Sequence, residues 1–182
     1  MGAHAYQEHY TYSDYQIWDG DWELIYGQAI SMAPSPMITH QAIASQIIVE
    51  LSNSINDKCD KCLILGEEDW KISEDTIVRP DVVMICNEPN EAYITKRPEI
   101  VVEVASKSTL KRDESVKYAL YQDEKVPYYI IVYPNDLKAK VYKLVDGKFE
   151  SQGSFLDETY ELDDAFCAAT IDFDRVFKRF RK

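Results

Sequence analysis

Residues 79–86 read RPDVVMIC and, after a polar loop, residues 100–106 read IVVEVAS. Both runs are rich in β-branched and other apolar side chains, which favours two buried strands. Asp81 opens the first run and Glu103 interrupts the second, and an ionised carboxylate in such a strand is costly unless a partner compensates its charge. If the two strands adjoin, these carboxylates offer hard oxygen ligands to one divalent cation. The pattern therefore predicts a metal site shared by two strands.

A structural alternative exists for both acidic residues. Asp81 can cap the turn at Pro80, and Glu103 can form a buried ion pair with Arg79 or Lys96. The strand context is compatible with either interpretation. Metal binding is the hypothesis that a structure must test.

Length and composition limit the class of protein. With 182 residues, of which 46% are apolar, the chain predicts a single domain over residues 1–182 with its core at about 37–145. No window approaches the roughly 18 continuous apolar residues of a membrane span. The polar, aromatic N-terminal residues 1–12 lack the basic start and apolar region of a secretory signal. We therefore expect a cytoplasmic protein without a membrane partner.

The charge balance is strongly acidic. Twenty lysines and arginines oppose 32 aspartates and glutamates, which gives a formal net charge of −12. Proteins that bind nucleic acid through its phosphates are normally basic. The acidity counts against tight metal-free binding of DNA, but it does not exclude a nuclease, because bound cations reverse the local sign of a carboxylate cluster.

The four cysteines include one close pair. Cys59 and Cys62 form a C-x-x-C, Cys86 lies in a predicted buried strand, and Cys167 is far along the chain. A zinc knuckle needs two further ligands at suitable spacing, and no H-x₃₋₅-H pair supplies them. We expect free thiols at a helix-to-strand turn, with zinc or redox use as the less favoured alternative.

Short helices and strands alternate along the chain and predict an α/β protein of the mixed, α+β kind, with one mixed sheet and helices packed on it. A helix start and a hairpin around Gly27 form an N-terminal extension of this α/β core. The predicted helices are 37–56, 112–123 and 172–180, after a helix start at 11–14; the predicted strands are 22–25, 28–32, 62–65, 69–73, 77–86 (interrupted at Pro80), 99–105, 128–133, 138–144 and 148–150.

Two helices carry polar side chains of interest. On the 37–56 helix, His40 and Glu50 lie on the apolar stripe that Ile43, Ile47, Leu51 and Ile55 define, so both face inward. On the 112–123 helix, the expected inward residues are Val116, Ala119 and Leu120. Lys117 lies at the edge of that face, although with Asp113 it also fits an exposed i,i+4 pair.

Taken together, ordered pieces of the sequence resemble the Uma2 (DUF820) family of restriction-endonuclease-like proteins in the PD-(D/E)XK nuclease superfamily. No single piece decides this, but their order along nearly the whole chain does. The pieces are Trp22–Gly27, Ala33–Pro36 with His40, Arg79-Pro80-Asp81, Glu103–Thr109, Asp113 with Lys117 and Tyr121, and Val126–Tyr129.

The resemblance implies a central mixed sheet flanked by helices, with Asp81 and Glu103 as the acidic pair. It also implies that Lys117 replaces the usual lysine two residues after the strand glutamate, because Ala105 occupies that position here; Lys107 is the second candidate. Glu50, His40 and Ser106 are accessory candidates, of which Ser106 equally fits a helix cap.

Three hypotheses follow. The first is an endonuclease that uses Mg²⁺ or Mn²⁺ to hydrolyse DNA, with Asp81 and Glu103 as metal ligands and Lys117 orienting or deprotonating water. A homodimer is expected, because cutting both strands needs two sites. The second is a catalytically silent nuclease fold that binds a protein or nucleic acid; the acidity and Ala105 favour it, and a lack of Mg²⁺ or Mn²⁺ binding by calorimetry would indicate it. The third is a metal-dependent hydrolase of another phosphate ester.

Overall fold

The computed structural model describes residues 8–32, 37–55 and 59–181. The predictions made for residues 1–7, for the Ala33–Pro36 segment and for the end of the first long helix at Asn56 lie outside these ranges. No helix in the described ranges is long and apolar enough to cross a membrane.

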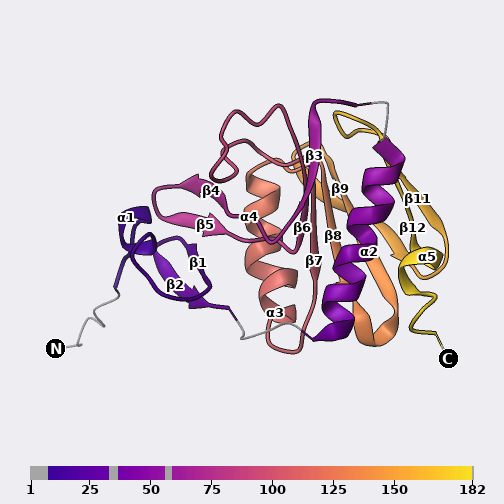
Figure 1. Ribbon diagram of the computed structural model, residues 1–182, viewed down its shortest axis with the longest axis horizontal. Helices are drawn as coiled ribbons and strands as arrows, with labels where there is room; N and C mark the ends of the chain where they lie inside the picture. Colours follow the sequence, from indigo (N-terminus) through magenta and orange to yellow (C-terminus); the bar gives the residue numbers. More distant parts are fainter. Residues whose placement is uncertain (1–7, 33–36, 56–58, 182) are drawn as a thin grey trace.

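A six-stranded mixed sheet forms the centre of the molecule, in the order β10-β9-β8-β7-β6-β3 (Figure 1). The pair β7·β8 is parallel and all other neighbours are antiparallel. A parallel pair needs a crossover, which α3 (Leu110–Arg112), η1 (Asp113–Lys117) and α4 (Tyr118–Asp123) provide. The strands are β3 (Cys62–Gly66), β6 (Val82–Cys86), β7 (Ile100–Val104), β8 (Tyr128–Tyr133), β9 (Lys138–Val145) and β10 (Lys148–Phe155).

The N-terminal hairpin is part of a second, four-stranded sheet, in the order β2-β1-β5-β4. Tyr26 and Gly27 form its two-residue turn, and both have positive φ, 51° and 76°, as the tight hairpin turn requires. The break predicted at Pro80 separates β5 from β6, and the two strands belong to different sheets. The members are β1 (Trp22–Ile25), β2 (Gln28–Ser31), β4 (Trp70–Ser73) and β5 (Thr76–Val78), with α1 (Tyr12–Tyr15) beside β1.

Each face of the central sheet has its own apolar layer. Helix α2 (Ile38–Ile55) covers one face with the predicted stripe, while α4 (Tyr118–Asp123) lies on the opposite side, towards the small sheet (Figure 1). Successive strand residues alternate between these layers, so Val102 packs toward α2 and Val101 toward α4. The mixed sheet with flanking helices confirms the predicted fold class.

The 112–123 helix differs from its prediction. It consists of α3 (Leu110–Arg112), a π-helical turn η1 (Asp113–Lys117) and α4. A π turn holds more than 3.6 residues, so it shifts every later side chain relative to an α-helical pattern. Asp113 and Lys117 are buried, whereas Val116 and Ala119 are exposed, and of the three expected inward residues only Leu120 is buried. The prediction for Val116 and Ala119 was wrong, as was an exposed Asp113–Lys117 pair.

The C-terminal segment adds a two-stranded ribbon that the sequence analysis missed. It comprises β11 (Thr159–Leu162) and β12 (Ala169–Asp172), followed by the short helix α5 (Phe173–Phe177) that Asp172 caps. Ribbon and helix pack against α2 on the outer side of the molecule (Figure 1). The observed last helix, α5, is therefore shorter than the helix predicted at 172–180.

All four cysteines are paired in the structure. Disulfides join Cys59 to Cys167 and Cys62 to Cys86, so the prediction of free thiols was wrong. The first pair is separated by 108 residues in the chain, and spacing alone could not reveal that the terminal ribbon returns to the start of β3.

Candidate active site

A pocket of about 620 Å³ opens where β6 begins and β7 ends. The antiparallel register pairs Val82 with Val102, so Asp81 and Glu103 stand opposite each other one step further along. The sequence prediction that neighbouring strands place these two residues side by side is therefore confirmed. Residues from both sheets, α2 and the segment after β7 line the pocket; they include Glu23, Thr39, His40, Arg79, Asp81, Glu103, Ser106, Lys107, Arg112, Asp113 and Lys117.

Asp81 is held at the edge of the pocket by two contacts. Its Oδ2 accepts a hydrogen bond of 2.6 Å from the backbone N–H of Val104 and lies 3.2 Å from Nε2 of His40. Burial lowers the pKa of His40, but the hydrogen bond and the charge of Asp81 outweigh that effect, so the pKa of His40 is raised. The pairing with Asp81 therefore favours the cationic form of the His40 imidazole.

Glu103 lies deeper and is almost entirely buried. Its Oε1 accepts hydrogen bonds from Lys117 Nζ at 2.8 Å and from the Tyr121 hydroxyl at 2.7 Å. Burial raises the pKa of Glu103 well above its ordinary range, and the charge of Lys117 offsets only part of that effect. The negative charge of Asp81 also raises the pKa of Glu103, because the two carboxylates repel each other. Two acidic residues of one site thus have very different surroundings.

Lys117 reaches the strand end from the π turn, as the resemblance implied. Besides Glu103, it contacts Glu23 Oε1 at 2.6 Å, and its side chain is 3% exposed. Burial acts to lower the pKa of Lys117, but the two carboxylates raise it far above its ordinary value. Its amine is consequently a permanent cation. Lys107, the second candidate, also lines the pocket but is exposed.

Sequence reasoning missed Glu23 as a site residue. It is fully buried on β1, and its Oε1 accepts both Lys117 and the backbone N–H of Arg79 at 3.0 Å. The signal was available, because Glu23 is a carboxylate within the apolar strand Trp22–Ile25, as Glu103 is within β7. Its strand was assigned to a peripheral hairpin, and that assignment concealed its approach to the core.

The three accessory candidates have different locations. His40 lines the pocket. Ser106 also lines it, and its Oγ and N–H exchange hydrogen bonds with Thr109. The N-cap residue of α3 is Thr109, so Ser106 stabilises the turn before that helix and is not the helix cap itself. Glu50 is buried but accepts from Gln46 at 3.0 Å, ten helical residues or about 15 Å from His40, outside the pocket lining.

The ion pairs proposed as a structural alternative are not those observed. Arg79 binds Asp21 and Asp69 through its guanidinium, and Lys96 donates its backbone N–H to Glu88. Glu103 pairs with Lys117 instead. Both Arg79 and Lys96 are therefore excluded as partners of Glu103 among the contacts of the described residues.

The donor set at the strand ends suits a hard divalent cation. The contacts above use Asp81 Oδ2 and Glu103 Oε1, which leaves Asp81 Oδ1 and Glu103 Oε2 for another ligand. In the described ranges, no three His, Cys or carboxylate ligand atoms around Asp81 lie within 4.8 Å of one another. Two carboxylates plus water are nonetheless what Mg²⁺ commonly takes from a protein.

The fold resembles that of a protein whose structure has been solved. A solved structure, described as the "Crystal structure of a putative nuclease belonging to DUF820 from Anabaena variabilis ATCC 29413", superimposes with a TM-score of 0.73. It is 15% identical, and the match covers 92% of this chain and 97% of the other. At that identity the likeness shows that the two chains share a fold. A comparison with curated proteins gave no match.

The family is shown by the sequence itself. The model of the Uma2 family, described as "Putative restriction endonuclease", matches residues 12–172. This chain belongs to the Uma2 family. The expectation drawn from the ordered pieces of sequence is thereby confirmed.

Proposed function

We propose that this protein is a divalent-metal-dependent endonuclease that hydrolyses DNA phosphodiester bonds. The single observation that carries the proposal is the juxtaposition of Asp81 and Glu103 at adjoining strand ends, with Lys117 donating to Glu103 in the same pocket. Family and fold support a nuclease role. DNA as the substrate and PD-(D/E)XK-type chemistry are parts of the proposal.

Asp81 and Glu103 would hold Mg²⁺ or Mn²⁺ through their remaining oxygens. When bound, the ion supplies Lewis acidity toward a phosphate oxygen and lowers the pKa of a water. His40 and the Val104 N–H fix the orientation of Asp81. Tyr121 does the same for Glu103 from within the core. Both carboxylates are thus pre-oriented before any ligand arrives, which is how a site avoids reorganisation during reaction.

Lys117 acts as a cation rather than as a base in this proposal. Its raised pKa keeps the amine protonated, so it can orient the attacking water and offset charge that develops on the phosphate, but it has no lone pair with which to take a proton. Of the two roles that the sequence left open for this lysine, orientation is the one we retain.

Basic side chains at the pocket can receive the scissile phosphate. Arg112 and Lys107 both line it, and Arg112 Nε is a buried donor without a hydrogen-bond partner among the described residues. A guanidinium matches phosphate geometry well. We assign these two residues to phosphate binding, and we further propose a homodimer, because each copy offers one such site and a double-strand cut needs two.

The test is cleavage of supercoiled plasmid in Mg²⁺, Mn²⁺ or EDTA. We expect metal-dependent nicking by the wild type and a loss of at least about 100-fold in Asp81→Asn and Glu103→Gln, since each removes a charged ligand. Glu50→Gln is the matched control, because this buried carboxylate lies outside the pocket, and it should cut like the wild type. Full activity in a purified, folded Asp81→Asn or Glu103→Gln variant would refute the proposal.

A silent interaction module is the second candidate. The observation that favours it is the commitment of Glu103 Oε1 to two buried donors, in a chain of net charge −12. Calorimetry separates the two functions. Heat of Mg²⁺ or Mn²⁺ binding that Asp81→Asn abolishes supports the nuclease, whereas no binding at millimolar metal supports the module.

A further inference from the structure

A cluster of four cysteines lies at the opposite end of β6 from the proposed active site. Cys86 ends that strand and Asp81 precedes it, so the two places are about 17 Å apart along the strand. Cys62 stands directly opposite Cys86 on β3, the edge strand of the sheet. Cys59 comes just before β3, and Cys167 belongs to the loop that precedes β12.

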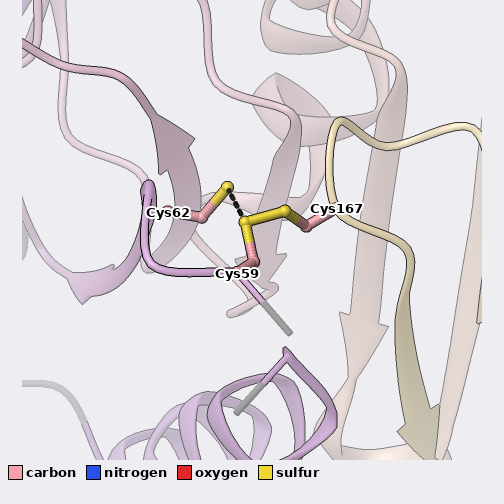
Figure 2. Close-up of side chains that lie close together, drawn as sticks. All are labelled: Cys59, Cys62 and Cys167. Carbon is pink, nitrogen blue, oxygen red and sulfur yellow. Dashed lines mark hydrogen bonds between the residues drawn. A yellow bond between two sulfur atoms is a disulfide. The ribbon is translucent and has the colours of Figure 1, made fainter. Parts of the chain in front are cut away.

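The sulfurs of the two disulfides are in contact with each other. Cys59 Sγ, which is bonded to Cys167, lies 3.2 Å from Cys62 Sγ (Figure 2). Cys62 is bonded to Cys86. The ligand atoms of Cys59, Cys62 and Cys167 all lie within 4.8 Å of one another. Two independent cross-links have no need to touch. Three of the four sulfurs therefore form one cluster, and the fourth, that of Cys86, is bonded to Cys62 within it.

That arrangement has the chemistry of a thiolate metal site. A tetrahedral zinc ion with Zn–S bonds of about 2.3 Å holds its sulfurs about 3.8 Å apart. The sulfurs of Cys59 and Cys62 are 3.2 Å apart, and reduction of the two disulfides frees the bonded sulfurs to separate toward the zinc spacing. Cys59 and Cys62 have the C-x-x-C spacing common in such sites. Thiolates select zinc over the hard cations proposed for the carboxylates.

The surroundings favour a closed, structural site. Cys62 and Cys86 are buried, at 7% and 8% exposure, and Cys59 and Cys167 are half-buried against the same core. Four protein ligands leave no open position for a substrate. Such a centre would fasten the terminal ribbon to the edge strand β3, which is otherwise the unpaired side of the sheet.

We propose that the reduced chain binds one Zn²⁺ through the thiolates of Cys59, Cys62, Cys86 and Cys167. The disulfide-bonded structure is the oxidised, metal-free counterpart. A dithiol reductant delivers four electrons and four protons to the two disulfides, its own thiols becoming disulfides, and yields four thiols. Binding of Zn²⁺ then releases four protons and leaves four Zn–S bonds.

The experiment uses the full chain purified under dithiol reductant without chelator. Elemental analysis should find about one zinc ion per chain, with four titratable thiols after denaturation and zinc removal. Replacement by Co²⁺ should give the thiolate-to-cobalt charge-transfer and strong visible absorption of a tetrahedral sulfur site. This spectrum is recorded on the wild type, so the test does not depend on any variant folding.

Variants then identify the ligands. Cys59→Ser and Cys167→Ser should each lower zinc affinity at least about tenfold, since even changes to groups that only support ligands cost about 10–100-fold. Ser54→Ala is the matched control: its hydroxyl accepts the Thr170 N–H at 3.0 Å, so it loosens the same ribbon without removing a sulfur, and zinc affinity should remain.

Three outcomes would overturn the proposal. The first is a reduced wild type with four free thiols that takes up neither Zn²⁺ nor Co²⁺. The second is a cobalt spectrum without thiolate charge transfer. The third is zinc retained in both cysteine variants but lost in Asp81→Asn, which would place the ion at the carboxylates.

Discussion

Glu103 and Asp81 show how similar side chains acquire different properties from their surroundings. Asp81 lies at the pocket edge beside His40, whereas Glu103 is buried between Lys117 and Tyr121. Only the former remains close to solvent. When two acidic groups of one site have such different environments, their roles differ as well. We expect the position of the Glu103 carboxylate to depend on its buried partners Lys117 and Tyr121. We expect the Asp81 carboxylate to interact more readily with ions from the solvent.

The charges around Lys117 lead to a stability prediction. Lys117→Met would leave Glu103 and Glu23 buried without their shared cation, so we expect the free energy of unfolding at pH 7 to fall by about 3–5 kcal/mol. Urea denaturation measures it. The double variant Lys117→Met/Glu103→Gln should recover part of the loss, because it removes one of the two buried carboxylates that Lys117 contacts. Glu23 keeps its contact with Arg112 Nη2 at 3.6 Å. A loss below about 1 kcal/mol in the single variant would contradict this account of the buried pair.

Sequence alone located residues that line the pocket where a charge interrupts an apolar strand. Asp81 and Glu103 were found in that way, and Lys117 was chosen from its place beside an apolar face. Glu23 carried the same signal but was missed, because its importance depends on β1 approaching the π turn. That contact joins residues 94 positions apart in sequence, and no local pattern encodes it.

At the scale of elements, helix α2 is the clearest case of a pattern that determines structure. Ile47 on its stripe is fully buried, while Val49 two residues later is 45% exposed. We predict that Ile47→Ala lowers the free energy of unfolding by about 2–5 kcal/mol, whereas Val49→Ala changes it by less than about 0.5 kcal/mol. Thermal or chemical denaturation of both variants checks this. Equal effects would mean that α2 does not bury the face described.

The loop between β6 and β7 is organised by Glu88. This carboxylate accepts the backbone N–H groups of Asn90, Thr95 and Lys96. Partial burial acts to raise its pKa, but these hydrogen bonds outweigh burial, and the pKa of Glu88 is lowered. A lowered folded-state pKa contributes stability above the unfolded value of about 4.3, and that contribution is lost as pH falls through the folded value.

Glu88→Gln therefore has a pH-dependent effect. We expect it to lower the free energy of unfolding by about 1 kcal/mol at pH 7, with the difference from the wild type shrinking below about pH 4 as the wild-type carboxylate takes up its proton. Urea denaturation between pH 7 and pH 3 measures the difference. The exposed Glu91 on the same loop supplies the control Glu91→Gln, which should match the wild type throughout. A difference that is constant with pH would count against the hydrogen-bonded carboxylate.

Elements were predicted best where the pattern was long. The α2 stripe and the strands β6 to β8 follow from continuous apolar runs. The π turn did not, because its two buried residues, Asp113 and Lys117, are charged and apolar periodicity does not mark them. The strands β11 and β12 were missed because each has four residues and the segment around them is rich in acidic side chains.

The whole molecule combines a strongly acidic composition with a pocket that is lined in part by lysine and arginine side chains. A net charge of −12 repels DNA at long range, and the divalent ion that we propose for the pocket would reverse the sign locally. We predict that a short DNA duplex binds at least about tenfold more weakly in EDTA than in Ca²⁺, as measured by fluorescence anisotropy at fixed ionic strength. Asp81→Asn should lose most of this difference. Equal affinity in EDTA and Ca²⁺ would show that metal plays no part in DNA binding.

The overall architecture followed from the sequence to a large extent. The mixed sheet and its flanking helices were expected, whereas the second sheet and the cysteine cluster were not. Both depend on contacts between distant segments, such as β1 with β5 and Cys59 with Cys167. Such pairings are set by how layers pack, and they are visible only when the whole chain is assembled.

The most direct test of the central claim is a Mn²⁺ soak of crystals of this protein, with anomalous scattering used to locate the ion. We predict one peak shared by Asp81 and Glu103, with carboxylate oxygens of both within about 2.0–2.6 Å. A well-ordered pocket with no peak there, or a peak that only one of the two carboxylates reaches, would contradict the claim that these strands hold a common cation.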